Sequence, residues 1–306
     1  MTEGSTTMCH DACHLNRIGI GIIGATIIGA SAVLAAQQPP SCAAAPQSVA
    51  RLPALPEASG LAISRTTSGR LWTHNDSGAP ALFALNAQGA LTARVRLSGL
   101  RVNDWEALAA GRCPAGSCLF IGDIGDNDSA RRQISVYRLA EPGASEGATP
   151  EAFHATYPDG RHNAETLLID SQGRLYLITK EETRPPRLYR FPAELKAGAT
   201  HSLEPVKLSG TAAATFTRIS DGSVSPDGQW AALRNDQQVA FFKAQDFFAG
   251  RWSPARTVDI TGVGEPQGEG LAIADDGTLY LAGEGAGESA PGTFARVACL
   301  PAQPLR

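Results

Sequence analysis

The sequence predicts an all-β protein, a β-propeller with five four-stranded blades. A short apolar strand that opens on a small or acidic residue occurs five times in the 306 residues, at intervals of 47 to 59 residues. Repetition with a period of about 50 residues is typical of radial or solenoid arrays, and four strands in each repeat favour a propeller. The five strands open at Ser59, Glu106, Glu165, Gly222 and Glu269.

Turn residues connect each opening strand to a second strand. Asp227-Gly228 and Asp276-Gly277 separate two such pairs of strands, and Gln172-Gly173 separates another. Turns of this kind between β-rich runs indicate hairpins. Third strands are expected at 81–85, 134–138, 187–191, 239–242 and 293–297, and fourth strands at 91–95, 152–155, 203–207 and 255–259.

The fifth repeat lacks a fourth strand, because it ends near Cys299 after three strands. Residues 48–52, which precede the first repeat, could supply the missing outer strand and close the ring without leaving an open sheet edge. Five blades are therefore preferred. A six-bladed ring would need a hidden repeat in 140–162 or 195–216, where no second hairpin is visible, and a β-sandwich would make the repeats coincidental.

The first 47 residues differ from the rest of the chain. Arg17 is followed by an uncharged run of 19 residues, 18–36. Such a run is typical of a secretory signal peptide, and it is also just long enough to span a bilayer. We therefore expect export to the periplasm or the extracellular space. The expected organisation is a cleaved signal peptide or a single membrane anchor at 1–36, a linker at 37–47, the propeller at 48–301 and a tail at 302–306.

Export makes disulfide bonds expected among the cysteines that follow this run. Two of the six cysteines precede the run and would be lost on cleavage, which leaves an even number. Cys113 and Cys118 flank a short turn and are expected to pair. Cys42 and Cys299, one near each end of the mature chain, would then join the strands that close the ring.

Composition excludes some functions. The net charge is −4, and no stretch rich in Lys or Arg follows the first 50 residues, so we expect no nucleic-acid partner. The chain also has no Gly-x-Ser-x-Gly, no His-Glu-x-x-His and no glycine-rich phosphate loop. A monomer is expected.

Acidic residues gather where the opening strands begin. The innermost strands of a propeller start at one face, and the loops between second and third strands emerge there, so these carboxylates would meet at the ring axis. Oxygen ligands of this kind suit Ca²⁺. The alternative is that the glutamates hold ordered water or tie the blades together. The metal ligands predicted are Asp104, Glu106, Asp123, Glu165 and Glu269.

Other polar residues in the same loops are candidates for ligand binding or catalysis. Lys180 and Arg234 could hold an anionic ligand, or could instead pair with the acids. The amides expected beside them are those of Asn75, Asn127 and Asn163. If the site is catalytic, His74 or Asp76 would act as the base, with Glu106 at the metal.

Four segments carry a resemblance to known proteins. They are Ser59-Gly60-Leu61-Ala62, 104–109 (Asp-Trp-Glu-Ala-Leu-Ala), 122–127 (Gly-Asp-Ile-Gly-Asp-Asn) and Asn163-Ala164-Glu165. With them the chain resembles, over about residues 55–285, a group of exported bacterial propeller proteins of poorly defined function. More loosely, its Glu openers and acidic loops are similar to phytase-like and calcium-dependent apyrase propellers. That similarity implies Ca²⁺-dependent hydrolysis of phosphoesters or phosphoanhydrides.

These observations predict two functions. The first is an exported propeller whose carboxylate-rich face binds Ca²⁺ and acts as a binding module in the cell envelope, for a small anionic ligand or for a protein or glycan. The second is a Ca²⁺-dependent hydrolase of phosphoesters or other esters.

Overall fold

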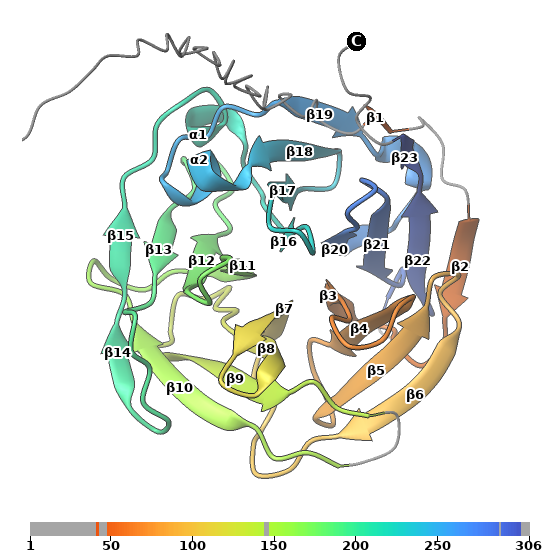
Figure 1. Ribbon diagram of the computed structural model, residues 1–306, viewed down its shortest axis with the longest axis horizontal. Helices are drawn as coiled ribbons and strands as arrows, with labels where there is room; N and C mark the ends of the chain where they lie inside the picture. Colours follow the sequence, from red (N-terminus) through yellow and green to blue (C-terminus); the bar gives the residue numbers. More distant parts are fainter. Residues whose placement is uncertain (1–40, 43–47, 144–146, 288, 301–306) are drawn as a thin grey trace, which may run out of the picture. The chain divides into compact units, whose positions relative to one another are not determined.

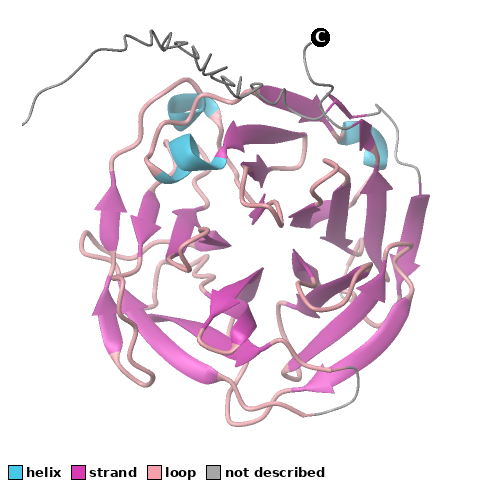
Figure 2. Ribbon diagram, in the orientation of Figure 1, coloured by secondary structure: helices cyan, strands magenta, loops and turns pink. Residues whose placement is uncertain are grey.

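A computed structural model describes residues 41–42, 48–143, 147–287 and 289–300. The chain divides into two compact units, 1–36 and 37–306, and the described residues all belong to the second. In this unit five sheets stand around a common axis (Figure 1), and strands make up nearly all of the regular structure (Figure 2). The predicted five-bladed propeller is confirmed.

Each blade is an antiparallel sheet whose first strand lies nearest the axis. Blade 1 contains β3 (Ala58–Ile63), β4 (Arg70–Asn75), β5 (Ala81–Asn86) and β6 (Leu91–Arg96). Blade 2 contains β7 (Trp105–Cys113), β8 (Gly116–Asp123), β9 (Ile134–Ala140) and β10 (Glu151–Thr156). Blade 3 contains β11 (Ala164–Ile169), β12 (Leu175–Thr179), β13 (Leu188–Arg190) and β15 (Glu204–Val206). Blade 4 contains β16 (Asp221–Val224), β17 (Trp230–Arg234), β18 (Gln238–Lys243) and β19 (Arg256–Asp259). Blade 5 contains β20 (Gln267–Ile273), β21 (Leu279–Glu284), β22 (Gly292–Val297) and β2 (Ser48–Leu52).

The N-terminal strand closes the ring as predicted. Strand β2 pairs antiparallel with β22, so the first and last described parts of the propeller share blade 5. A second short pairing, of β1 (Ser41–Cys42) with β23 (Cys299–Leu300), places Cys42 opposite Cys299 along the backbone. Cys42 is in a disulfide, whereas the side chain of Cys299 lies outside the described residues.

The predicted Cys113–Cys118 disulfide is present at the β7–β8 turn, with Cα atoms 5.8 Å apart. The other expectations for the chain ends concern residues that are mostly undescribed. The predicted signal peptide or anchor (1–36), most of the linker (37–47) and the tail (302–306) lie outside the described ranges. Within the described ranges, no helix has the length and apolar character needed to cross a membrane.

The connection between β13 and β15, the last two strands of blade 3, differs from the prediction. The expected single strand at 203–207 is preceded by β14 (Thr200–Ser202), which adds in parallel to β10 as a fifth strand of blade 2. Leu203 is buried where the chain then passes to blade 3. Sequence analysis also left out the short helices α1 (Ala212–Thr215) and α2 (Ala244–Phe248) and the 3₁₀ turn η1 (Thr261–Val263).

The core lies between the blades. Five hydrophobic clusters occur in the described part of the chain, and each joins side chains from two neighbouring blades. Trp72 and Trp105 are fully buried in the cluster between blades 1 and 2, as expected for residues that pack between blades. Because every blade buries side chains against both neighbours, the ring holds the innermost strands in fixed positions around the axis.

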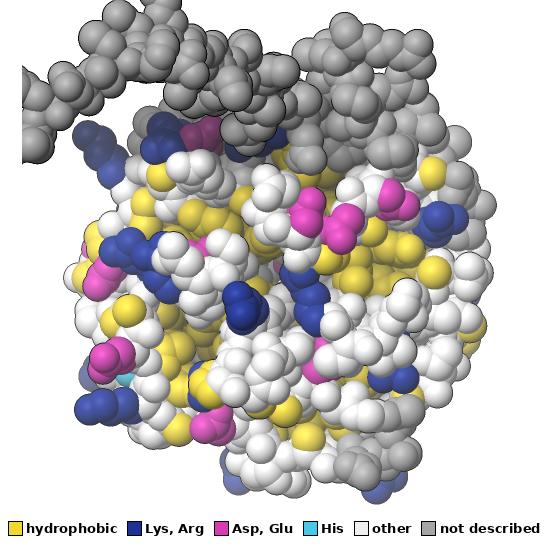
Figure 3. All heavy atoms as spheres, viewed as in Figure 1, with side chains coloured by type: hydrophobic (Ala, Val, Ile, Leu, Met, Phe, Trp, Pro, Cys, Tyr) yellow, Lys and Arg dark blue, Asp and Glu magenta, His cyan; other side chains and the backbone are white. Residues whose placement is uncertain are grey.

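Charged side chains of both signs share the face seen along the ring axis, and basic side chains lie near its centre (Figure 3).

Candidate metal centre at the ring axis

Three glutamates project from β-bulges at the start of three innermost strands. The register slips by one residue at Glu106 in β7, at Glu165 in β11 and at Glu269 in β20. A bulge leaves its extra residue outside the regular ladder and changes the direction of that side chain. Since the bulges occupy equivalent positions in blades 2, 3 and 5, they direct the three carboxylates towards one another.

These carboxylates, which we call the glutamate cluster, meet at one end of the axis. One oxygen atom from each of Glu106, Glu165 and Glu269 lies within 4.8 Å of the other two. All three side chains are buried, with at most 7% exposed. This is the geometry that a single cation held by three carboxylates would need.

Blades 1 and 4 contribute no glutamate to the cluster. In blade 1 the bulge falls at Gly60, between Ser59 and Leu61, so the residue equivalent to the glutamates is Gly60 rather than the predicted Ser59. A Cβ at Gly60 would lie 2.6 Å from Leu108 N, which leaves no space for a side chain. The Ser59 hydroxyl instead donates to Glu106 O and ties blade 1 to blade 2.

The cluster is only partly satisfied by the protein. Lys180 Nζ lies 2.6 Å from Glu165 Oε2, and Asn163 Nδ2 donates to Glu165 Oε1. Gln267 Nε2 donates to Glu269 Oε1 at 2.8 Å. Glu269 Oε2 is buried and has no hydrogen-bond partner among the described residues. A buried carboxylate oxygen without a donor is costly, and a cation would remove that cost.

A fourth carboxyl group lies behind the cluster. Asp221 in β16 is fully buried, and its Oδ2 accepts from Leu271 N in the next blade at 2.7 Å. Its Oδ1 has no hydrogen-bond partner in the described chain. Sequence analysis left the direction of this side chain open, and the structure shows that it faces the core near Glu269.

Arg234 is buried in the protein and is not exposed to a ligand. Its guanidinium is 0% exposed, and Nη2 pairs with Glu265 Oε2 at 2.8 Å. Nη1 donates to Gly270 O at 3.0 Å. A Cβ at Gly268 would lie 1.8 Å from Arg234 Nη2, so this glycine makes room for the guanidinium. Of the two predicted anion-binding cations, only Lys180 is partly exposed.

Burial of these carboxyl groups favours their protonated forms. Burial raises the pKa of Glu165 to about 8, with a further contribution from Glu269. Burial, then repulsion from Glu165 and Glu269, raises the pKa of Glu106 well above its usual range. The pKa of Glu269 and that of Asp221 are also raised, mainly by burial. Without a cation, the cluster therefore retains protons at neutral pH.

Lys180 is the main counter-charge of the cluster. Desolvation opposes its charged form, but attraction to Glu165 and Glu269 outweighs desolvation, and the pKa of Lys180 is raised. It stays protonated and offsets one of the three carboxylates. Because its side chain is 20% exposed, it can also face an anion arriving at the cluster.

The Gly-Asp-Ile-Gly-Asp-Asn loop packs over the cluster. A Cβ at Gly125 would lie 2.3 Å from Asp104 Oδ2 and 2.7 Å from Glu106 Oε1, so only glycine fits at this position. Asp104 lies beside Glu106 but outside the three-glutamate group, and burial raises its pKa. The fully buried Ile124 anchors the loop in the core between blades 2 and 3.

The remaining acids and amides of this loop are engaged with the protein. Asp123 forms an ion pair of 2.7 Å with Arg131, so the structure does not bring this predicted ligand into the cluster. Asp126 accepts from Ala130 N at 2.7 Å, and its own N–H donates to Asn163 Oδ1. Asn127 Oδ1 accepts from Asn163 Nδ2 at 2.9 Å. The loop is thereby held against blade 3.

His74 is a structural residue between blades 1 and 2. It lies in β4 rather than in a loop, it is fully buried, and burial lowers its pKa to about 4. Its ring nitrogens lie 3.1 Å from Asn75 O and 3.3 Å from Ala107 O, and its ring packs edge-on against Trp105. Asn75 Oδ1 accepts from Glu57 N. The hydrogen bonds of these two side chains within the described chain go to residues outside the glutamate cluster.

A second acidic group lies on blades 1 and 5. Burial, then a hydrogen bond with Glu57, raises the pKa of Asp76 to about 8. Burial, then repulsion from Glu269 and Glu57, raises the pKa of Glu284 to about 7. Among the described residues, Asp76 Oδ1 is buried without a hydrogen-bond partner. Glu284 was not among the predicted site residues, and its only sequence signal is its place at the end of a second strand, β21.

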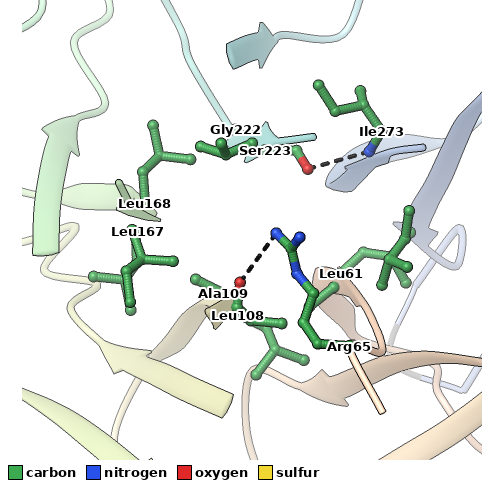
Figure 4. Close-up of a pocket in the computed structure, with 14 residues that line it drawn as sticks. Leu61, Arg65, Leu108, Ala109, Leu167, Leu168, Gly222, Ser223 and Ile273 are labelled. Atoms are coloured by element: carbon green, nitrogen blue, oxygen red, sulfur yellow. Dashed lines mark hydrogen bonds between the residues drawn. The ribbon is translucent and has the colours of Figure 1, made fainter. Parts of the chain in front are cut away.

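Below the cluster the axis is nearly closed. The later halves of all five innermost strands line a cavity of about 20 Å³ (Figure 4). That is room for roughly one water molecule. Its walls include Leu61, Leu108, Leu167, Leu168 and Ile273. On this side of the cluster the ring axis therefore has little free space.

No family model matches the chain, and no curated protein matches it. Solved structures do match. The allergen Mala s 1 of Malassezia sympodialis is 13% identical, covers 79% of this chain and 93% of its own, and has a TM-score of 0.53. Apo aldose sugar dehydrogenase of Escherichia coli is 13% identical over 84% of this chain and 99% of its own, with a TM-score of 0.46. A gluconolactonase of Xanthomonas campestris is 13% identical over 87% and 96%, with a TM-score of 0.44.

At such identities the likeness to Mala s 1 concerns the fold alone. The resemblance to phytase-like and apyrase propellers is not confirmed by these comparisons and stays a prediction. What the chain does must therefore be argued from its own side chains.

Proposed function

We propose that the glutamate cluster holds one divalent cation, with Ca²⁺ favoured, and that the cation and Lys180 together bind a small anionic ligand. The proposal is carried by one observation, the convergence of three buried carboxylates within 4.8 Å of one another. The unpartnered Glu269 Oε2 supports it independently. Carboxylate oxygens suit Ca²⁺, Mg²⁺ or Mn²⁺ rather than softer metals.

The choice of Ca²⁺ rests on the flexibility of the donor set. Ca²⁺ accepts six to eight oxygens in irregular geometry, whereas Mg²⁺ needs near-octahedral order. Three carboxylates from three blades, one of them shared with Lys180, leave several coordination positions for water or for ligand oxygens. An anion at these positions would contact the cation and the partly exposed Lys180 together.

Thermal melting tests the cation site. We expect addition of Ca²⁺ to the EDTA-treated protein to raise the melting temperature, because a ligand that binds only the folded state stabilises it. Glu269→Gln should lose this rise. Glu151 is an exposed glutamate on β10 that pairs with Arg138, and Glu151→Gln should keep the rise in melting temperature. If Ca²⁺, Mg²⁺ and Mn²⁺ all leave the wild-type melting temperature unchanged, the cation site does not exist.

We also propose where the protein acts. A binding module of the cell envelope is consistent with the disulfide at Cys113 and Cys118, because such bonds persist in oxidising compartments. Mass spectrometry of the mature N-terminus would test export. A mature chain that begins after residue 36 supports it, and an intact, cytosolic chain argues against it.

The raised pKa values of two acids near the cluster support a hydrolase as a second candidate function. Asp76 and Glu284 have pKa values raised to about 8 and about 7, close to the pH at which a general base works best. If a cation-bound water is activated here, Asp76→Asn should abolish turnover of simple phosphoesters or esters while Ca²⁺ binding persists. If the Ca²⁺-loaded wild-type protein shows no turnover, the hydrolase is rejected and the binding module is the function that stands.

A further inference from the structure

The far end of the axis carries an arginine that, among the described residues, forms no ion pair within 4 Å. Arg65 follows β3, and its side chain reaches from blade 1 to the centre of the ring (Figure 4). Nη2 donates to Ala110 O in β7, at 3.4 Å. Ala110 lies four residues after Glu106 along the strand. This separation corresponds to about 13 Å, so Arg65 is distinct from the glutamate cluster.

The guanidinium of Arg65 is poorly satisfied by the protein. Among the described residues, no carboxylate lies within 4 Å of it, and its Nε is buried with no hydrogen-bond acceptor. Asp275, Glu141 and Asp227 attract the guanidinium from farther away. The oxygens of Glu141 accept from Ser64, Trp72 and the Arg65 backbone N–H. Leaving a charged donor without an acceptor is unfavourable, and an anion would supply that acceptor.

A cavity of about 310 Å³ opens beside this guanidinium. It is at the small end of the range for small-molecule sites, roughly 300 to 1,000 Å³. Arg112 also lines it and has no ion-pair partner in the described part of the chain. The hydroxyls of Ser117 and Ser225, which also line the cavity, already donate to Glu141 and Asp227. The two arginines therefore supply the donors that this wall offers to an oxygen acceptor.

The acids in the same lining limit the charge of the ligand. Asp170 is paired with Arg174 at 2.9 Å, but Asp227 has only neutral donors, among them the Ser225 hydroxyl. A phosphate dianion would be repelled by Asp227, whereas a monoanion would gain from the arginines at smaller cost. A planar carboxylate also matches the fork of a guanidinium.

We propose that the cavity at the Arg65 end of the axis is a binding site for a small carboxylate, held by Arg65 with Arg112 at the rim. The site is distinct from the cation site, because Arg65 contacts Ala110, about 13 Å along the strand from Glu106. It would let the propeller bind one ligand at each end.

Nuclear magnetic resonance of the full chain in EDTA tests this site. Sodium acetate is titrated while the Nε–H signal of Arg65 is followed, with that signal assigned by its absence in Arg65→Met. We expect a saturable shift, and no shift with sodium chloride at equal ionic strength. Arg65→Lys keeps the charge but loses the fork. Followed at the Nε–H signal of Arg112, which lines the same cavity in both proteins, this variant should bind acetate at least about tenfold more weakly than wild type.

The controls separate binding from folding. Arg256→Met alters an arginine on the outer strand β19, and it should leave the acetate response of Arg65 unchanged. Arg65→Met should melt close to wild type in EDTA, since it removes a charge that forms no direct ion pair in the described part of the chain and whose burial opposes its charged form. The proposal is overturned if acetate causes no saturable shift, if Arg65→Lys binds acetate as tightly as wild type, or if phosphate binds more tightly than acetate.

Discussion

Glu106→Gln should make the metal-free protein more stable, although it removes a predicted metal ligand. In the absence of a cation, Lys180 offsets one of the three clustered charges. The other two carboxylates then repel each other when both are ionised. Glutamine keeps the shape of the side chain and removes one of these charges. Like charges gathered in a binding site repel one another, so they reduce the stability of the fold when no ligand is bound.

The size of the effect follows from the geometry. Two unit charges 4.8 Å apart, the largest separation within the cluster, repel by about 3.5 kcal/mol at an effective dielectric constant of about 20. The protein avoids part of this cost by retaining a proton. We therefore expect Glu106→Gln to raise the free energy of unfolding by about 2 to 3 kcal/mol at pH 9, or roughly 5 to 10 °C in melting temperature.

The effect must depend on pH with a definite sign. The folded-state pKa of Glu106 is raised, so the folded protein holds a proton that the unfolded chain releases above about pH 4.5. Stability of the wild-type protein then falls as pH rises from that value and levels off above the folded-state pKa. At pH 5 the raised pKa of Glu106 keeps its carboxyl group protonated in the folded state, and Glu106→Gln should differ from wild type by less than about 0.5 kcal/mol.

Chemical denaturation in EDTA at pH 5, 7 and 9 measures the effect. Glu151→Gln, on the exposed face of β10, should show no trend with pH and serves as the control. Addition of Ca²⁺ should stabilise wild type but not Glu106→Gln. The electrostatic account is refuted if Glu106→Gln is less stable than wild type at pH 9, or if the difference is the same at pH 5 and pH 9.

Three further predictions follow from the same geometry. Gly125→Ala should weaken Ca²⁺ binding at least about tenfold, because the new methyl group would displace Asp104 and Glu106; Gly143→Ala, where a Cβ meets nothing within 4 Å, is the control, and equal calorimetric affinities would contradict the prediction. Arg234→Met should lower the free energy of unfolding by about 3 to 5 kcal/mol, because Glu265 keeps a buried charge without a partner. Breaking the exposed Arg190–Glu204 pair should cost less than about 1 kcal/mol. Equal losses of stability in urea denaturation would be inconsistent with burial as the cause. Affinity for Ca²⁺ should increase from pH 6 to pH 9 with release of protons, because the cation displaces protons from carboxyl groups whose pKa values are raised, that of Glu165 to about 8; an affinity independent of pH would show that these groups are already ionised.

The fold could be predicted from the sequence because its signals are local. Hairpin turns such as Asp227-Gly228 and the alternation of apolar strands repeat in each blade, and ring closure follows from the strand that the last repeat lacks. The crossing strand β14 could not be predicted in the same way. Its pairing with β10 depends on where the connection between β13 and β15 of blade 3 passes in space.

The glutamates could also be predicted, because a repeat places equivalent residues around one axis. What the repeat does not show is the bulge, which makes Gly60 rather than Ser59 the counterpart of Glu106. The partners of Arg234 were equally hidden. A polar residue before a loop suggests exposure, and only the space left by Gly268 in the next blade allows this guanidinium to be buried.

Asp123 shows a further limit of reasoning from residue type. Its carboxylate looked like a metal ligand because it lies among other acids, but Arg131, eight residues later, pairs with it. Arg65 was not identified at all, since nothing in its local sequence distinguishes it from a surface arginine. Its role depends on a cavity formed by several blades.

The most direct test of the glutamate cluster is isothermal titration calorimetry of Ca²⁺ into the EDTA-stripped protein at pH 8, for wild type and for Glu269→Gln. The account predicts one site per chain in wild type and binding at least about tenfold weaker in Glu269→Gln, because one of three carboxylate ligands is lost. Titrations with Mg²⁺ and Mn²⁺ under the same conditions identify the preferred cation. Absence of binding for all three cations, or equal affinities in the two proteins, would contradict the assignment of Glu106, Glu165 and Glu269 as a metal centre.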